Sequence, residues 1–141
     1  MTATVLLADD DSSLRFVLSP ARSREGYRVR ATGAVATLAK WVRDGEGDLV
    51  VSDVFMGDEC VFDALPALRS VRPELPVIVM SAQSTVSTAM SAAGVGAYDY
   101  LPKPFDLDDM LASVKRALQG AKGRGRANAA PAPRDVRALG G

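Results

Sequence analysis

The distribution of apolar residues divides the chain into short apolar runs that alternate with segments of helical periodicity. Five runs have the length and composition of β-strands, namely Val5–Ala8, Tyr27–Ala31, Leu49–Asp53, Val77–Met80 and Tyr98–Leu101. After each run, apolar residues recur every three or four positions, which predicts a helix. Strands that alternate with helices in this way predict an α/β fold, a doubly wound (βα)5 sandwich around a five-stranded parallel sheet.

Prolines and small residues shape the expected helices. Pro20 lies inside the first helical segment and predicts a kink, because proline removes a helical hydrogen bond. Pro66 is tolerable only near the start of the third helix, whose apolar stripe runs from Phe62 to Val71. The segment from Ser84 to Ala93 is weakly amphipathic, so we expect a mobile helix there.

Two further helices have apolar faces that we expect to point inward. These residues are Val35, Leu38, Ala39 and Val42 in the second helix and Leu107, Met110, Leu111, Val114 and Leu118 in the last. Between the third strand and the third helix, Met56–Glu59 is expected to be a polar loop.

Length and charge suggest one domain with a tail. The chain has 141 residues, of which 48% are hydrophobic, and single domains cluster near ~100 to 150 residues. Residues 1–120 hold 12 basic and 16 acidic side chains, whereas residues 121–141 hold five basic residues and one acid. We therefore expect a folded domain over 1–120 and a flexible basic Ala/Gly/Pro/Arg linker or tail over 121–141. Nonspecific nucleic-acid binding by this tail is an alternative to a solvated linker.

Several classes of protein are excluded by composition. Cys60 is the only cysteine, so an internal disulfide is impossible. No apolar run approaches the roughly 20 residues that span a bilayer, and the N-terminus lacks the pattern of a secretory signal. These features predict a cytoplasmic protein that does not enter a membrane.

Polar residues follow four of the predicted strands. Asp9–Asp11 follow the first strand, Asp53 ends the third, Ser81 follows the fourth and Lys103 follows the fifth. The carboxyl ends of parallel strands meet at one edge of a sheet, where such folds bind ligands. Clustered carboxylates at an open edge favour Mg²⁺, and a lysine and a hydroxyl facing it favour a phosphoryl group. The edge therefore predicts phosphoryl transfer to a carboxylate.

These residues resemble the receiver domain of two-component response regulators over about residues 4–120. The motifs Ala8–Ser13, Met80–Gln83 and especially Gly96–Asp106 are similar to those of the nitrogen regulatory protein C (NtrC) subfamily. The resemblance implies a flavodoxin-like and CheY-like fold and a phosphoacceptor signalling domain. Such a domain is not an enzyme, although it assists its own phosphorylation and dephosphorylation.

The resemblance also implies roles for the site residues. Asp53 would accept phosphate from the phosphohistidine of an NtrB-like sensor histidine kinase. Asp11 and Asp53 would bind Mg²⁺ directly together with the backbone carbonyl of Phe55, Asp10 would act largely through water, and Asp9 would lie outside the direct ligands.

The remaining implied roles concern the switch. Ser81 and Lys103 would hold the phosphoryl oxygens, and Lys103–Pro104 would be a cis peptide. Tyr100 would turn inward when Ser81 moves to the phosphate, and the helix from Ser84 to Ala93 would be displaced.

Relatives of this type continue into an ATPase that remodels sigma-54 polymerase and a DNA-binding helix-turn-helix. Neither a Gly-x-x-x-x-Gly-Lys-Ser/Thr motif nor room for a DNA-reading domain is found here. The expectation is an N-terminal fragment, or a truncated product, of a transcriptional activator of nitrogen-assimilation genes. It would contact DNA and polymerase only through domains absent from this chain. A homodimer through the last helix and the neighbouring strand is left open.

One departure and one alternative accompany this interpretation. Gly57 stands where the family commonly has proline, which would loosen the loop after the phosphorylated strand. The alternative is a Mg²⁺-dependent haloacid-dehalogenase-like phosphatase, because Asp9-x-Asp11 after the first strand fits its signature. In that enzyme Asp9 would be the nucleophile and Asp53 would have no role.

Overall fold

The computed structural model describes residues 3–9, 27–82 and 86–127. The predictions for the first helix, including the kink at Pro20, lie outside these residues, as do Asp10 and Asp11. Among the described residues, no helix is long and apolar enough to cross a bilayer.

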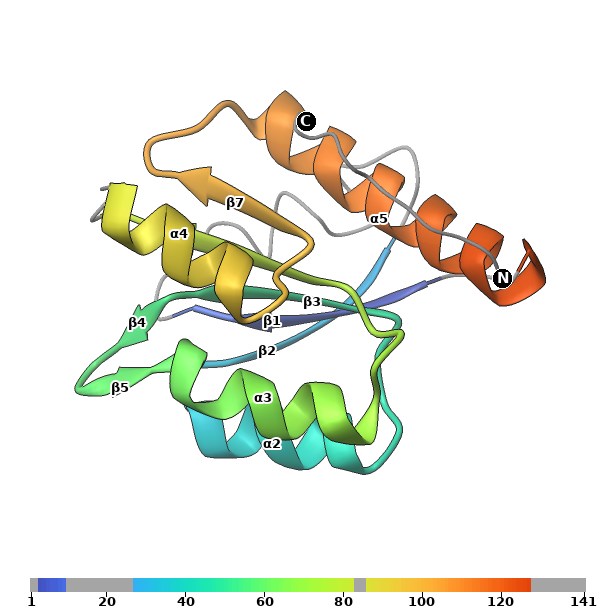
Figure 1. The fold of residues 1–141 in the computed structure, drawn as a ribbon, viewed down its shortest axis with the longest axis horizontal. Coiled ribbons are helices and arrows are strands. Elements are labelled where there is room, and N and C mark those ends of the chain that lie inside the picture. The colour runs from blue at the N-terminus through green and yellow to red at the C-terminus, as the bar shows by residue number, and fades with distance from the viewer. Residues whose placement is uncertain (1–2, 10–26, 83–85, 128–141) are drawn as a thin grey trace.

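A five-stranded, all-parallel sheet forms the centre of the molecule (Figure 1). Its strands are β1 (Thr4–Ala8), β2 (Arg28–Thr32), β3 (Leu49–Asp53), β6 (Val77–Ser81) and β7 (Asp99–Pro102), in the order β2-β1-β3-β6-β7. The strand order places β1, β3 and β6 in the interior of the sheet. These three strands are the most apolar, since strands buried on both faces lack polar alternation. The predicted (βα)5 sheet is confirmed over the described strands.

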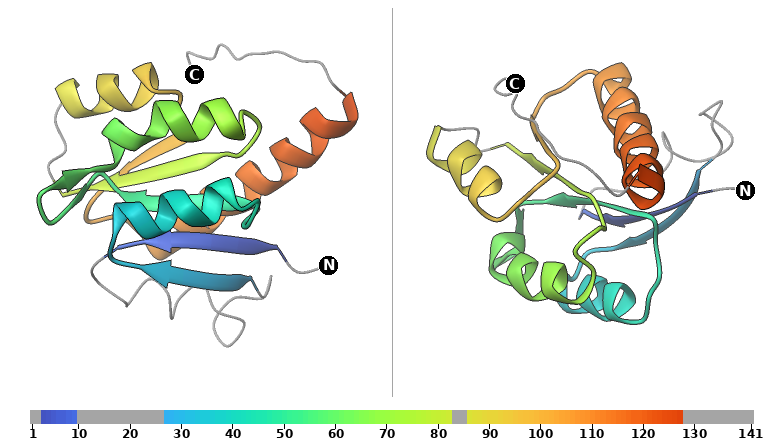
Figure 2. Two further views of the ribbon diagram at one scale, coloured as in Figure 1. Left: turned by 90° about the horizontal axis from the view of Figure 1, so that it is seen from below. Right: turned by 45° about the vertical axis from the view of Figure 1, so that its right-hand side comes forward.

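The helices form two layers that enclose the sheet (Figures 1 and 2). Helices α2 (Val35–Arg43) and α3 (Val61–Val71) lie side by side on one face, and α5 (Leu107–Ala127) crosses the other. Helix α4 (Val86–Gly94) lies near β7. Successive strand residues therefore alternate between two apolar layers.

The sheet separates two hydrophobic cores. On the α2–α3 side, Leu6, Val50 and Val79 pack with residues of those helices. On the α5 side, the alternate strand residues, among them Leu7 and Ile78, pack against the helix. From α5 the fully buried apolar side chains are Met110, Val114 and Ala117. The apolar stripe predicted for the second helix is confirmed, since Val35, Leu38, Ala39 and Val42 are all buried.

Helix α3 differs from its prediction in two ways. Pro66 lies in the interior of the helix rather than near its start. Its side chain is exposed, so the ring does not disturb the core. The proline destabilises the helix only through its missing N–H donor and the clash of its ring with the preceding turn of backbone. The stripe also ends early: Leu65 and Leu68 are buried, but Val71 is 51% exposed. Val71 is the last helical residue, where the chain is already leaving the core.

The segment after β3 is more regular than predicted. The expected polar loop over Met56–Glu59 is a hairpin in which β4 (Phe55–Met56) pairs with β5 (Glu59–Cys60). Gly57, in the turn, has a φ of 60°, a conformation that glycine adopts at low cost. The backbone N–H of Val61 donates to the carbonyl of Val54 at 2.8 Å and closes the base of the hairpin.

The last helix is longer at its carboxyl end than expected. Helix α5 continues through Ala127, so the predicted domain boundary at residue 120 falls inside it. Leu107, expected to face inward, is 45% exposed at the first turn. Leu107 is the first residue of the helix, and burial begins with Met110, which is fully buried.

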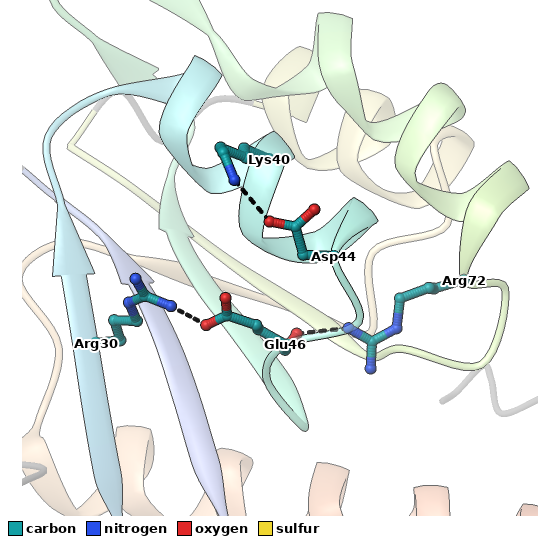
Figure 3. Close-up of polar contacts among 5 residues, drawn as sticks. All are labelled: Arg30, Lys40, Asp44, Glu46 and Arg72. Carbon is teal, nitrogen blue, oxygen red and sulfur yellow. Dashed lines mark hydrogen bonds and ion pairs between the residues drawn. The ribbon is translucent and has the colours of Figure 1, made fainter.

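Arginine side chains fix the turn between α2 and β3 (Figure 3). Arg72, at the end of α3, donates to the backbone carbonyls of Glu46 and Gly47, the latter at 2.8 Å. Arg30 on β2 pairs with the Glu46 carboxylate and lies 4.2 Å from the centroid of the Trp41 ring. This turn begins β3, so it determines where Asp53 arrives at the opposite edge.

Candidate phosphoacceptor site

Three charged side chains meet at the carboxyl edge of the sheet. Lys103 Nζ lies 3.0 Å from Asp53 Oδ1 and 3.1 Å from Asp53 Oδ2. The same ammonium group is 3.7 Å from Asp9 Oδ2. Residues from β1, β3 and the segment after β7 thus converge, as their positions at strand ends predict.

Backbone hydrogen bonds beyond the strand ends hold these residues in place. Asp9 N–H donates to the carbonyl of Thr32 at 3.0 Å, which extends the pairing of β1 by one residue. Lys103 N–H donates to the carbonyl of Ser81 at 2.8 Å. The charged side chains are therefore carried on hydrogen-bonded backbone, which limits their freedom before any ligand binds.

The electrostatic environment of Asp53 favours its protonated form. Its side chain is 15% exposed. Burial, followed by the hydrogen bond that protonated Asp53 donates to Asp9 and by the negative charge of Asp9, raises the pKa of Asp53 from 3.8 to about 6, against the opposing effect of Lys103. Asp53 is therefore still ionised at neutral pH, but burial and Asp9 together outweigh the stabilisation that Lys103 gives to its charged form.

Lys103 remains a cation at neutral pH. Burial lowers its pKa, but the hydrogen bond and charge of Asp53, together with Asp9, outweigh this, so that the pKa of Lys103 is raised. An ammonium group fixed at this position can neutralise a group that becomes attached to Asp53.

Asp9 was predicted to lie at this edge but outside the direct Mg²⁺ ligands. Its side chain is only 4% exposed and contacts Lys103, so the structure includes it in the cluster. The sequence does contain a feature that points to Asp9. This residue directly follows Ala8, the last residue of β1, and Ala8 pairs with Ser52, the neighbour of Asp53 on β3. Asp10 and Asp11 lie outside the described residues, within which no group of three or more His, Cys, Asp or Glu side chains gathers.

The other predicted site residues flank this cluster. Ser81 ends β6 and is 2% exposed. Phe55 lies in β4, two residues past Asp53, with 47% of its surface exposed. The Lys103–Pro104 peptide bond is cis. Tyr100 packs against the α2–α3 core, and its hydroxyl is buried without a hydrogen-bond partner in the described part of the chain.

Residues 5–115 match the family described as the response regulator receiver domain. The chain belongs to this family. The predicted receiver fold and its signalling role are thereby confirmed, whereas the phosphatase alternative finds no support. The receiver interpretation also accounts for Asp53, which the phosphatase leaves without a role although it contacts Lys103.

The relatives of this receiver domain include NtrC proteins. The chain is 56% identical over 122 residues to the DNA-binding transcriptional regulator NtrC of Rhizobium meliloti (strain 1021), covering 86% of this chain and 25% of that protein. It is 53% identical over 116 residues to NtrC of Azospirillum brasilense, covering 82% and 24%. The resemblance to NtrC is confirmed, and the receiver domain spans about a quarter of these relatives' length.

A solved structure agrees with this assignment. The solution structure of the beryllofluoride-activated NtrC4 receiver domain dimer has a TM-score of 0.75 and 29% identity to this chain, covering 84% of this chain and 98% of that one. This chain therefore shares its fold with the receiver domain of NtrC4.

Proposed function

We propose that this receiver domain accepts a phosphoryl group on Asp53 from the phosphohistidine of an NtrB-like sensor histidine kinase. A carboxylate oxygen of Asp53 attacks phosphorus, the P–N bond to the imidazole breaks, and an aspartyl phosphate forms. The departing imidazole retains the electron pair of that bond. The observation that carries the proposal is the 3.0 Å contact between Lys103 Nζ and Asp53 Oδ1.

Lys103 and Ser81 supply the charge compensation that phosphoryl transfer requires. The ammonium group of Lys103 already faces both oxygens of Asp53, so it is positioned to neutralise a phosphoryl oxygen. The Ser81 hydroxyl, on the neighbouring strand, donates a hydrogen bond to another. Such positioning and charge neutralisation account for most of the catalysis of phosphoryl transfer.

The same edge fits Mg²⁺. Asp9 and Asp53 offer two carboxylates at this edge, and Lys103 is the cation that contacts both of them. Mg²⁺ typically takes one or two carboxylates and fills its remaining positions with water and phosphate oxygens. We assign Asp53 and the backbone carbonyl of Phe55 as ligands, joined by one or more of the acids Asp9, Asp10 and Asp11. When bound, the ion offsets the negative charge of the phosphoryl oxygens.

A switch follows from the position of Tyr100. Its buried hydroxyl has no partner among the described residues, and an unsatisfied buried hydroxyl is unfavourable. Movement of Ser81 towards a phosphoryl group would allow Tyr100 to turn and satisfy this hydroxyl. Helix α4 is the element that this movement would displace.

The wider biological role is proposed by similarity to NtrC. As part of an NtrC-like cytoplasmic activator, the receiver domain would regulate transcription of nitrogen-assimilation genes. Contacts with sigma-54 polymerase and DNA would belong to other domains, and a homodimer through α5 and β7 is compatible with the dimeric NtrC4 receiver.

The proposal is tested by intact-mass spectrometry after incubation with Mg²⁺ and acetyl phosphate. We expect one phosphoryl adduct on the native chain and none on Asp53→Asn. Asp58→Asn, an exposed acid in the adjacent hairpin turn, controls for the change in charge and should retain the adduct. An adduct that persists in Asp53→Asn would refute the assignment of the phosphoacceptor.

A further inference from the structure

One carboxylate joins strand β7 to helix α5. Asp99, the first residue of β7, accepts the backbone N–H of Tyr100 on Oδ1 at 2.8 Å. Its other oxygen, Oδ2, accepts the hydroxyl of Ser113 at 2.6 Å. Asp99 therefore bonds to the strand backbone and to a helix side chain at the same time.

This bond differs in kind from the apolar contacts of α5. Met110, Val114 and Ala117 are fully buried and pack against apolar residues of the sheet. Apolar contacts are non-directional and tolerate small rotations and shifts of a helix. Ser113 is also fully buried, whereas the Asp99 side chain is 31% exposed, and the hydrogen bond between them is charge-assisted and directional. The bond therefore fixes the rotation of α5 relative to β7.

A second contact, from Arg116, is peripheral. Its Nη2 lies 3.6 Å from Asp99 Oδ2, but the arginine side chain is 60% exposed. Exposed ion pairs are weakened by solvent and contribute little. Ser113, and not Arg116, is the residue through which Asp99 holds the helix.

The same strand leads to the phosphoacceptor site. From Asp99 the chain passes through Tyr100, the proposed switch residue, and reaches Lys103, which contacts Asp53. Lys103 N–H is bonded to the carbonyl of Ser81. A shift of Lys103 towards a phosphoryl group therefore acts on the strand to which α5 is attached.

We propose that Asp99, through its bond to Ser113, is a positioning residue that couples α5 to the strand carrying Tyr100 and Lys103. This coupling rests on the proposed function. Occupation of the Asp53 site shifts the position of β7, and the hydrogen bond between Asp99 and Ser113 transmits that shift to α5. Without the bond, the site is still occupied, but α5 no longer follows it.

Two-dimensional ¹H–¹⁵N NMR of the Mg²⁺-bound chain, with and without beryllofluoride, tests this coupling. In the native chain we expect amide shifts at Lys103 and also along 110–118 of α5. In Ser113→Ala and Asp99→Asn, the shift at Lys103 remains and the shifts in α5 fall at least twofold. Arg116→Ala, the matched control that removes only the exposed partner, retains both responses.

The outcomes separate the coupling from the proposed function. Full α5 shifts in Ser113→Ala would overturn the coupling, as would a native α5 that does not respond while Lys103 does. No response at Lys103 in the native chain would overturn the proposed function and the coupling with it. Should Asp99→Asn fail to fold, Ser113→Ala decides, since it removes one hydroxyl. Ser113→Thr, which restores a hydroxyl, is expected to restore the α5 response.

Discussion

The ammonium group of Lys103 contacts both carboxylate oxygens of Asp53, at 3.0 and 3.1 Å, across the intervening strand β6. The contact joins β3 to the segment that follows β7, the edge strand. It depends on the register of β6 with both neighbours, since Asp53 pairs with Met80 and Ser81 pairs with Pro102. The geometry of the site is therefore a property of the whole sheet rather than of one loop.

Replacing Lys103 with alanine should slow phosphorylation of Asp53 by about 10²- to 10³-fold, the usual cost of removing one electrostatic stabiliser of a transition state. Rates of adduct formation with acetyl phosphate, followed by mass spectrometry, measure this. Lys40→Ala removes an exposed lysine from α2 and should leave the rate unchanged. An unchanged rate in Lys103→Ala would contradict the role of Lys103.

Asp9→Asn should lower the pKa of Asp53 towards its ordinary value, because the hydrogen bond and charge of Asp9 contribute to raising it. If Asp9 also helps to hold Mg²⁺, affinity for the ion should fall by roughly 10- to 100-fold. Carboxyl NMR titration and isothermal titration calorimetry measure the two effects. Asp63→Asn, an exposed acid in the first turn of α3, is the control and should leave both unchanged.

The raised pKa of Asp53 makes stability depend on pH. In the absence of Mg²⁺, the folded chain holds the Asp53 proton up to about pH 6, whereas the ordinary value is 3.8. Folding therefore binds a proton between these values, so the contribution of Asp53 to stability is complete below about pH 4 and is lost as pH rises through 6.

Urea denaturation at pH 4 and pH 7, compared between the native chain and Asp53→Asn, measures this effect. The native chain should lose stability relative to the variant as pH rises. Equal stability differences at both pH values would mean that Asp53 does not titrate as described.

Pro66→Ala should stabilise the domain. The proline is exposed in the interior of α3, where it removes a helical hydrogen bond at a cost of about 3 kcal/mol in an ordinary helix. Proline also restricts the unfolded chain, which offsets part of the gain, so we expect an increase of about 1 to 2 kcal/mol in the free energy of unfolding. A decrease on urea denaturation would show that α3 has adapted its backbone to the proline.

The sequence predicts the sheet well because the strand signal depends on burial. Leu49–Val51 and Val77–Met80 are apolar throughout since both faces of these strands are covered. The β4–β5 hairpin was not predicted, because strands of two residues have no periodicity to detect. Val71 was expected to be buried because it is apolar and continues the helical spacing. Its exposure depends on the direction in which the chain leaves the end of α3, which the spacing does not indicate.

The site was predicted from strand ends, and that rule finds Asp53, Ser81 and Lys103. It does not predict the contact between Asp9 and Lys103. That contact depends on the exact residue at which β1 pairing ends, and boundaries are the least certain part of a sequence-based assignment. Asp99 shows a similar limit, because the hydrogen bond that Ser113 donates to it joins residues that no local pattern relates.

The sheet divides the apolar interior into two compartments that share strands but not side chains. Substitutions on opposite faces have no common neighbours, and the effects of such distant changes on stability usually add. Residues facing α5 can thus diverge, or be redesigned, without repacking the layer beneath α2 and α3. Such a protein can change the surface that it presents to partners on the α5 side while the α2–α3 core continues to stabilise the fold.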